Sequence, residues 1–269
     1  MPIVEANGAR LHYEREGHGP PVLFIQGVGI AGCGWRPQID SLRHRFDCVA
    51  YDHRGVGEST GPTSPLSIEL LVDDAVALLD ALGWGRAHIV GHSMGGVVAT
   101  QLALDHPHRV RTLSLLCTFS KGKEALSLSA RMLGLGLRTR VGTASMRRNA
   151  FAEMVLPRAY LASRGRASAV AQLEEVFGRD LADAPDVVSQ QLEAMGRHDA
   201  SERLPELASI PTLVMVGSHD PIARPEFGMR LSGAIGSARY VEFDDASHAL
   251  PIQHPQAVNE LLAEHFARG

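Results

Sequence analysis

The chain alternates short runs rich in apolar residues with longer stretches whose apolar positions recur at helical spacing. Short apolar runs between polar or glycine-containing segments are typical of buried strands. We expect strands at residues 22–25, 46–51, 87–90, 110–117, 212–216 and 238–243. Apolar positions that recur every three to four residues predict amphipathic helices. We expect helices at residues 35–45, 67–82, 94–105, 225–231 and 256–266.

This order of elements indicates the fold class. Residues 3–5 and 11–14 are short extended segments around Asn7-Gly8, which is a common signal for a hairpin turn. Strands then alternate with helices, which is typical of a mostly parallel, doubly wound α/β sheet. In such sheets the functional side chains follow the C-terminal ends of the strands.

The alternation stops between residues 121 and 200, where the sequence predicts helices and little strand. This segment carries 12 Lys and Arg against 9 Asp and Glu, whereas the whole chain has a net charge of −4. The strand and helix pattern resumes after it. We therefore expect residues 1–120 and 201–269 to form one α/β core, and residues 121–200 to form an inserted helical cap, or lid, over the strand ends.

Composition excludes several classes of function. The 269 residues are 45% hydrophobic, and the net charge of −4 offers no attraction for nucleic acid. No stretch of about eighteen apolar residues predicts a membrane span, and the first residues do not resemble a secretion signal. Cys33, Cys48 and Cys117 are odd in number and widely spaced, which is typical of a reducing compartment. We expect a cytoplasmic protein with a small-molecule substrate, and a homodimer is compatible with the sequence.

The junction between the predicted strand 87–90 and helix 94–105 has the pattern Gly-x-Ser-x-Gly, with Ser93 at its centre. Such a turn holds its serine in a strained conformation, and the flanking glycines let the strand and the helix approach each other. The Ser93 hydroxyl is thereby presented at the edge of the sheet. Free amide groups at the start of the helix point to the same place, where an oxyanion would form. The pattern predicts a nucleophile, and a solvent-facing serine in a tight turn is the simpler alternative.

A nucleophilic serine needs a base that takes its proton, and histidine is the usual one. Of the 13 histidines, His248 is the best placed, because it follows the last predicted strand in a short loop. His92 adjoins the serine, but neighbouring side chains diverge in a sharp turn, so we expect it to pack. His219 also follows a strand, but its neighbour Asp220 suits the role of the acid better.

The base in turn needs an acid that fixes its tautomer. Asp220 directly follows the buried strand 212–216, which would hold its carboxylate rigidly and shield it from water. Asp244 and Asp245 are the alternatives, because they share a loop with the expected base. The order serine, aspartate, histidine along the chain is the one expected of a nucleophile-elbow enzyme.

Together these motifs resemble the α/β-hydrolase family over nearly the whole chain. The motifs are the serine turn, residues 52–59, Gly217-Ser218-His219-Asp220-Pro221 and Ala246-Ser247-His248. The resemblance implies that Ser93 is the nucleophile, that His248 is the general base and then the acid, and that Asp220 orients it. It also implies an oxyanion hole formed by the backbone N–H groups of Val28 and Met94.

The chain departs from the family in the loop after the strand 22–25, where Gln26-Gly27 replaces the usual His-Gly. A glutamine amide also donates and accepts hydrogen bonds, so we expect catalysis to survive and the pocket polarity to differ. The residues that we expect in the substrate pocket are Gln26, Gly27, Trp35, Phe119, Ile222 and Leu250. For Trp35, Phe119, Ile222 and Leu250, packing in the core is the alternative.

Three other patterns allow a second interpretation. The cap contains Arg131, Arg138, Arg140, Arg147 and Arg148. A guanidinium among them would bind a substrate carboxylate, although a solvated helix face is the favoured explanation. The glycine-rich segment 52–59 lacks the Gly-Lys-Ser/Thr ending of a phosphate loop, so a structural turn is favoured. No cluster of His, Cys and carboxylates has metal-ligand spacing, so we expect no metal and no cofactor.

An activated serine with two oxyanion donors predicts acyl transfer to water. A serine at position 93 excludes the haloalkane dehalogenases and epoxide hydrolases, which use an aspartate there. The segment 208–257 is similar to 3-oxoadipate enol-lactonases and small carboxylesterases. We therefore expect hydrolysis of a carboxylic ester or lactone of a small, partly apolar metabolite, with a thioester as a related substrate. The alternatives are a C–C bond hydrolase or biosynthetic tailoring enzyme, and a non-catalytic ligand-binding protein.

Overall fold

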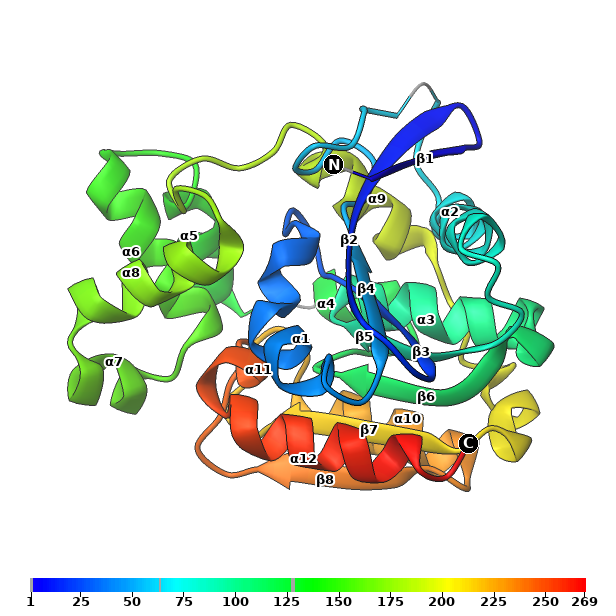
Figure 1. Cartoon of the computed structure of the whole chain (residues 1–269). Helices are drawn as coiled ribbons and strands as arrows, with labels where there is room; N and C mark the ends of the chain where they lie inside the picture. Colours follow the sequence, from blue (N-terminus) through cyan, green and yellow to red (C-terminus); the bar gives the residue numbers. More distant parts are fainter. Residues whose placement is uncertain (1, 63, 127–128) are drawn as a thin grey trace.

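The computed structural model describes residues 2–62, 64–126 and 129–269 (Figure 1). Within these ranges eight strands form one sheet in the order β1-β2-β4-β3-β5-β6-β7-β8. The strands are β1 Ile3–Ala6, β2 Ala9–Gly17, β3 Pro21–Ile25, β4 Asp47–Tyr51, β5 Ala87–His92, β6 Val110–Leu116, β7 Thr212–Gly217 and β8 Arg239–Phe243. β1 and β2 pair antiparallel, β2 and β4 likewise, and the remaining pairs are parallel. The predicted mostly parallel α/β sheet is confirmed.

Helices cover both faces of this sheet (Figure 1). Those of the sheet region are α1 Arg36–Leu42, α2 Ile68–Ala81, α3 Met94–Asp105, α10 Pro225–Ile235, α11 Leu250–Gln253 and α12 Pro255–Phe266, with 3-10 turns η1 Gly32–Trp35, η2 Pro107–Arg109 and η3 Leu204–Ser209. α1 packs on α12, and α2 packs on α3. No helix in the described ranges has the length and apolar content needed to cross a bilayer.

Local chemistry explains several of these boundaries. Asn7 and Gly8 both have positive φ angles, 48° and 77°, as the two-residue hairpin turn between β1 and β2 requires. The hydroxyl of Ser67 accepts a hydrogen bond from the Leu70 N–H at 3.2 Å and thereby caps the start of α2. The expected helix 35–45 is instead η1 followed by α1, because the chain turns after Leu42 to bring residue 46 into the core.

The strand order places two loops side by side. The chain passes from β3 to β4 on one side and then returns to β5 on the other side of β3. The reversal leaves a crevice between the C-terminal ends of β3 and β5, which is where open α/β sheets bind ligands. The loop after β3 begins with Gln26, and the turn after β5 holds Ser93, so both predicted parts of the site start here.

Between β6 and β7 the described chain contains six helices, which we call the helical insert. They are α4 Gly122–Leu126, α5 Ala130–Arg138, α6 Ala144–Val155, α7 Arg158–Arg164, α8 Arg166–Phe177 and α9 Val188–Arg197. α5 to α8 pack on one another beside the sheet (Figure 1). Leu161, Leu173 and Phe177 belong to an apolar cluster that also contains Ile30, Ala249 and Ile252 of the sheet region. Met132 and Leu135 of α5 form a smaller cluster with Ala150 of α6. α9 differs, because Ala194 and Met195 belong to the main core. The buried apolar residues of the insert therefore belong to three clusters.

His88 makes the stability of the sheet depend on pH. It lies buried in β5, stacked on Phe266, with Nδ1 2.9 Å from the Thr112 hydroxyl. Burial lowers the pKa of His88 from 6.5 to about 4. Between these two values the unfolded chain binds a proton that the folded chain does not, so stability falls as the pH drops from 6.5 towards 4.

We expect His88 alone to lower the unfolding free energy by about 2 kcal/mol between pH 7 and pH 5. His88→Gln removes this titration, so its stability should fall less over the same interval. Urea unfolding at both pH values measures the difference. His18→Gln, a change at an exposed loop residue, is the control and should keep the wild-type loss. An equal loss in His88→Gln and the wild type would contradict the assignment.

Candidate active site

Ser93 occupies a strained turn between β5 and α3. Its backbone angles are φ 56° and ψ −121°, a combination that L-residues rarely adopt. Glycine is required on both sides. A Cβ on Gly95 would lie 2.1 Å from the carbonyl oxygen of Ile25, and one on Gly91 would lie 2.3 Å from the carbonyl oxygen of Gly95. The pattern seen in the sequence therefore reflects direct contact between the helix start and the sheet.

The structure brings the three predicted chemical groups together. The Ser93 Oγ lies 2.9 Å from His248 Nε2, and His248 Nδ1 lies 2.7 Å from Asp220 Oδ2. The three residues follow β5, β7 and β8, so parallel strands deliver them to one edge of the sheet. All three are buried. The geometry is that of a serine, histidine and aspartate triad.

Asp220 is fixed by its own loop. Its Oδ1 accepts hydrogen bonds from the backbone N–H groups of Ile222 at 2.8 Å and Ala223 at 2.9 Å. Oδ2 is left to accept from His248 Nδ1, so the lone pair of Nε2 faces the serine hydroxyl. The alternative acids do not reach this position. Asp244 and Asp245 are exposed, and Asp245 pairs with His254 at 3.0 Å.

The two backbone groups predicted for the oxyanion hole lie at the start of α3 and in the loop after β3. Met94 is the first residue of α3, so its N–H has no acceptor within the helix. The loop after β3 approaches closely, since a Cβ on Gly27 would lie 3.1 Å from the Ser93 Cβ. In the described chain the Val28 N–H donates to no backbone or side-chain oxygen. Both N–H groups are available for an anion.

His92 does more than the expected packing. Its Nε2 lies 2.8 Å from the backbone oxygen of His248, and its Nδ1 lies 3.2 Å from Gln26 Oε1. Burial lowers the pKa of His92 to about 3, so the ring is neutral at ordinary pH. It therefore spans the space between the loop after β3 and the loop of His248. The sequence showed only that His92 adjoins Ser93, and this span depends on loops that meet in the folded chain.

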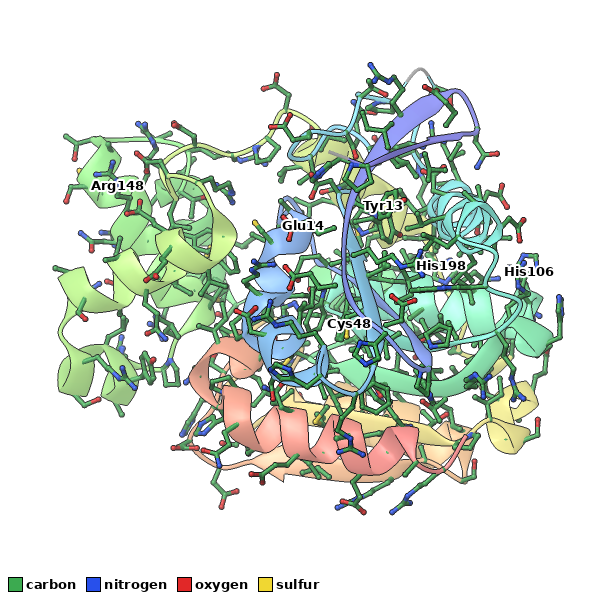
Figure 2. All side chains as sticks on the ribbon, in the orientation of Figure 1. Tyr13, Glu14, Cys48, His106, Arg148 and His198 are labelled. Atoms are coloured by element: carbon green, nitrogen blue, oxygen red, sulfur yellow. The ribbon has the colours of Figure 1, made fainter. Side chains whose placement is uncertain are left out.

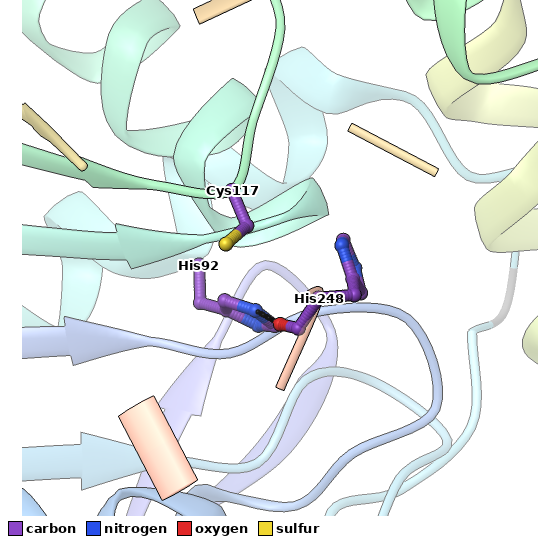
Figure 3. A group of neighbouring side chains, drawn as sticks. All are labelled: His92, Cys117 and His248. Carbon is purple, nitrogen blue, oxygen red and sulfur yellow. Dashed lines mark hydrogen bonds between the residues drawn. The ribbon is translucent and has the colours of Figure 1, made fainter. Parts of the chain in front are cut away.

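His92, Cys117 and His248 place ring nitrogens and a sulfur within 4.8 Å of one another (Figure 3). The sequence spacing did not indicate this cluster. Figure 3 shows the hydrogen bond from the His92 ring to the His248 backbone, and both nitrogens of His248 also have partners. Burial raises the pKa of the Cys117 thiol well above its usual value, whereas metals bind the thiolate. These groups fit a hydrogen-bonded cluster and do not fit a resident metal.

A cavity of about 300 Å³ opens at Ser93 and His248. Its wall is mostly apolar and combines the loops of the sheet with the helical insert. The lining includes Val28, Ile30, Phe119, Met132, Phe151, Met154, Phe177, Leu192, Met195 and Ile222. Of the residues expected in the pocket, Gly27, Phe119 and Ile222 lie on this wall.

Gln26, Trp35 and Leu250 do not lie on the cavity wall, and this corrects the expectation for them. Trp35 and Leu250 are fully buried in the main core, where Trp35 packs on Phe24 with ring centroids 5.2 Å apart. Gln26 turns back on its own loop, and its Oε1 accepts from the Gly27 N–H at 2.8 Å. Position after a strand indicates that a residue is near the site, but packing decides which way its side chain points.

Some arginines of the insert line the cavity and others do not. Arg140 lines the cavity, and Arg179, which the sequence pattern did not single out, lines it too. Arg148 lies on α6 (Figure 2), and its guanidinium pairs with Asp180. Arg147 donates to the backbone oxygen of Ala182 at 2.9 Å. Arg131 and Arg138 are exposed and are absent from the cavity wall.

Segment 52–59 forms a structural turn. Asp52 Oδ1 accepts from the Gly32 N–H at 2.7 Å, and its Oδ2 accepts from the Glu58 N–H at 3.0 Å. The next charge in the segment, Arg54, is fully buried in an ion pair with Asp74. These polar groups hold loops together and are not free for a phosphate.

Comparison with known proteins agrees with this geometry. The sequence pattern described as alpha/beta hydrolase fold matches residues 20–255, and the chain belongs to this family. It is 31% identical to a protein of Azorhizobium caulinodans named "Putative carbamate hydrolase RutD", over 97% of both chains. The enol-lactonase from Burkholderia xenovorans LB400 is 28% identical with a TM-score of 0.83, covering 99% of this chain and 100% of that one. A thermophilic esterase from Thermogutta terrifontis is 25% identical with a TM-score of 0.82, covering 99% and 97%. The chain is therefore a hydrolytic enzyme of the α/β-hydrolase family, as the motifs predicted.

The strain at Ser93 gives a stability prediction. Glycine tolerates φ 56°, whereas alanine keeps the Cβ that makes this conformation costly. Ser93→Gly should therefore be more stable than Ser93→Ala by about 1 kcal/mol, after allowing for the greater freedom of glycine in the unfolded chain. Both variants lack the hydroxyl, so the comparison isolates the backbone. Urea unfolding of the two variants measures the difference, and equal stabilities would show that the turn is not strained.

Proposed function

We propose that this protein is a serine hydrolase that cleaves a carboxylic ester or lactone of a small, partly apolar metabolite through an acyl-enzyme. The observation that carries the proposal is the hydrogen-bonded line from Ser93 through His248 to Asp220, which ends at an apolar cavity of about 300 Å³. A cavity of this size and character suits a small substrate. The helical insert acts as the cap that closes over it.

The geometry supports a two-step mechanism. As Ser93 Oγ attacks the substrate carbonyl carbon, its proton passes to His248 Nε2, and the new oxyanion is bound by the N–H groups of Val28 and Met94. The intermediate collapses, and the leaving alkoxide takes the proton from His248. Water then attacks the acyl carbon and gives its proton to His248 Nε2, and this proton passes to Ser93 Oγ as the bond between the acyl carbon and Oγ breaks. The products are the free acid and the regenerated hydroxyl, while Asp220 keeps the imidazole in one tautomer throughout.

The names of the relatives indicate which bonds to test. One relative is named as a carbamate hydrolase, one structure is an enol-lactonase and another is an esterase. Carbamates, lactones and esters share a carbonyl group, so the same nucleophile and the same oxyanion hole can act on all three.

Cys33, Cys48 and Cys117 are free thiols, which supports a cytoplasmic location for this chemistry.

The first test is a panel of esters, lactones, thioesters and carbamates of graded acyl length, assayed with the wild type and Ser93→Ala. We expect hydrolysis by the wild type and a loss on the order of 10⁴-fold or more in the variant, because the nucleophile is gone. An organophosphonate should label Ser93, with its mass increase located by peptide mass spectrometry.

Other outcomes of this test distinguish the alternatives. Normal labelling of Ser93 with no turnover of any ester, lactone, thioester or carbamate would indicate the C–C bond hydrolase or tailoring enzyme. Neither labelling nor turnover would indicate a ligand-binding protein. Full activity in Ser93→Ala would contradict the proposed mechanism itself.

Asp220→Asn tests the choice of acid. The amide cannot hold the same tautomer of His248, so we expect kcat to fall on the order of 10³- to 10⁴-fold while the fold is retained. Asp244→Asn and Asp245→Asn are matched controls, because both side chains are exposed and neither reaches His248. They should keep near wild-type kcat. Strong loss in a control with little loss in Asp220→Asn would reverse the assignment.

A further inference from the structure

The charged residues on the cavity wall are of one sign. Among the described residues that line the cavity, Arg140 and Arg179 are the charged side chains, and neither Asp nor Glu is present. The rest of the wall is apolar apart from Ser93, His248, His92 and Thr139. Arg179 is partly buried, so its charge is screened less than that of the exposed Arg140, and an anionic group on the ligand would be attracted to it.

Arg179 is held in place without a carboxylate. Its guanidinium lies over the ring of Phe151, 5.8 Å from the centroid, and its Nη1 donates to the backbone oxygens of Asp180 and Asp183. Its buried Nε has no acceptor in the described part of the chain. Burial lowers the pKa of Arg179, which records the cost of keeping this charge away from water. A fixed cation with unused donors favours an anion as ligand.

The acids nearest to Arg179 are engaged elsewhere. Asp180 accepts from Arg148 Nε at 2.7 Å, and Arg148 also lies 3.0 Å from Glu174. Asp183 is exposed and lies 4.0 Å from Arg147. Over the residues that the structure describes, no carboxylate lies within ion-pair distance of Arg179 or Arg140. Within the insert Arg147, Arg148, Arg166 and Arg197 pair with carboxylates, whereas the two arginines on the cavity wall have no such partner among the described residues.

We propose that the substrate carries a carboxylate in addition to the bond that is cleaved, and that Arg179 binds this carboxylate with Arg140 beside it. This proposal rests on the proposed function, because it assigns a substrate class to the same cavity. The guanidinium donors suit a planar carboxylate, and the apolar wall suits the hydrocarbon chain that joins it to the reactive carbonyl. Arg179 and Arg140 are substrate-binding residues in this account and take no part in bond cleavage.

The test compares two esters that differ in one group. Monomethyl adipate carries a carboxylate where methyl hexanoate carries a methyl group, and pH-stat titration gives kcat/KM for both. We expect the wild type to prefer monomethyl adipate, and we expect Arg179→Gln to lower that preference by between about 10- and 100-fold. Arg179→Lys, which retains the charge, should restore part of the preference. Arg140→Gln should lower it less, because this side chain is more exposed.

Arg138→Gln is the matched control, because Arg138 lies at the exposed end of α5 and is absent from the cavity wall. It should keep the wild-type preference. If Arg179→Gln slowed both esters equally, the preference would be unchanged, the residue would be structural, and the proposal would be overturned. A wild type that hydrolyses both esters equally well would overturn it too.

A binding measurement separates this proposal from the proposed function. Calorimetry with adipate needs no catalysis, so it reports on the anion site even if no ester is cleaved. We expect adipate to bind the wild type and Ser93→Ala, and to bind Arg179→Gln at least about tenfold more weakly. Adipate binding without any turnover would leave the carboxylate site standing and overturn the proposed function. Ester turnover without adipate binding would support the proposed function and overturn the carboxylate site.

Discussion

The close approach of α3 to β3 and β5 is the constraint on which the rest of the structure depends. Gly95 lies against the carbonyl of Ile25, and Gly96 lies against Thr118, where a Cβ would come within 2.6 Å of that side chain. Thr118 in turn donates its hydroxyl hydrogen to the backbone oxygen of Ser93 at 2.7 Å. A larger residue at either glycine would move the helix outward, and both the strained serine and the amide groups at the helix start would move with it.

Much of this site follows from rules that act along the sequence. Glycines at positions 91 and 95 mark a close approach that no larger residue permits, and the C-terminal ends of parallel strands bring Ser93, Asp220 and His248 to one edge. The sequence alone left Asp244 and Asp245 open as acids. In the folded chain the Asp220 carboxylate lies 2.7 Å from His248 Nδ1, and backbone donors from Ile222 and Ala223 fix it there.

The remainder depends on side-chain direction, which local sequence does not determine. Trp35 follows a loop near the site, yet it turns into the core to pack on Phe24. Arg179 lies on the cavity wall because of how the helices of the insert pack, so its position among several arginines carries no signal in the sequence. The bridge from His92 to the backbone of His248 likewise joins residues from different strands.

The insert and the catalytic loops are mechanically joined, and this limits how independently they can act. The Gly29 N–H, in the loop after β3, donates to Gln191 of α9 at 2.8 Å. The Ala249 N–H, next to His248, donates to the backbone oxygen of Val155 in α6 at 3.0 Å. A displacement of the insert would therefore strain both the loop after β3 and the loop that holds His248. Arg179 lies over the ring of Phe151 in α6, so a ligand bound to Arg179, as proposed, would contact the helix whose Val155 accepts from the Ala249 N–H.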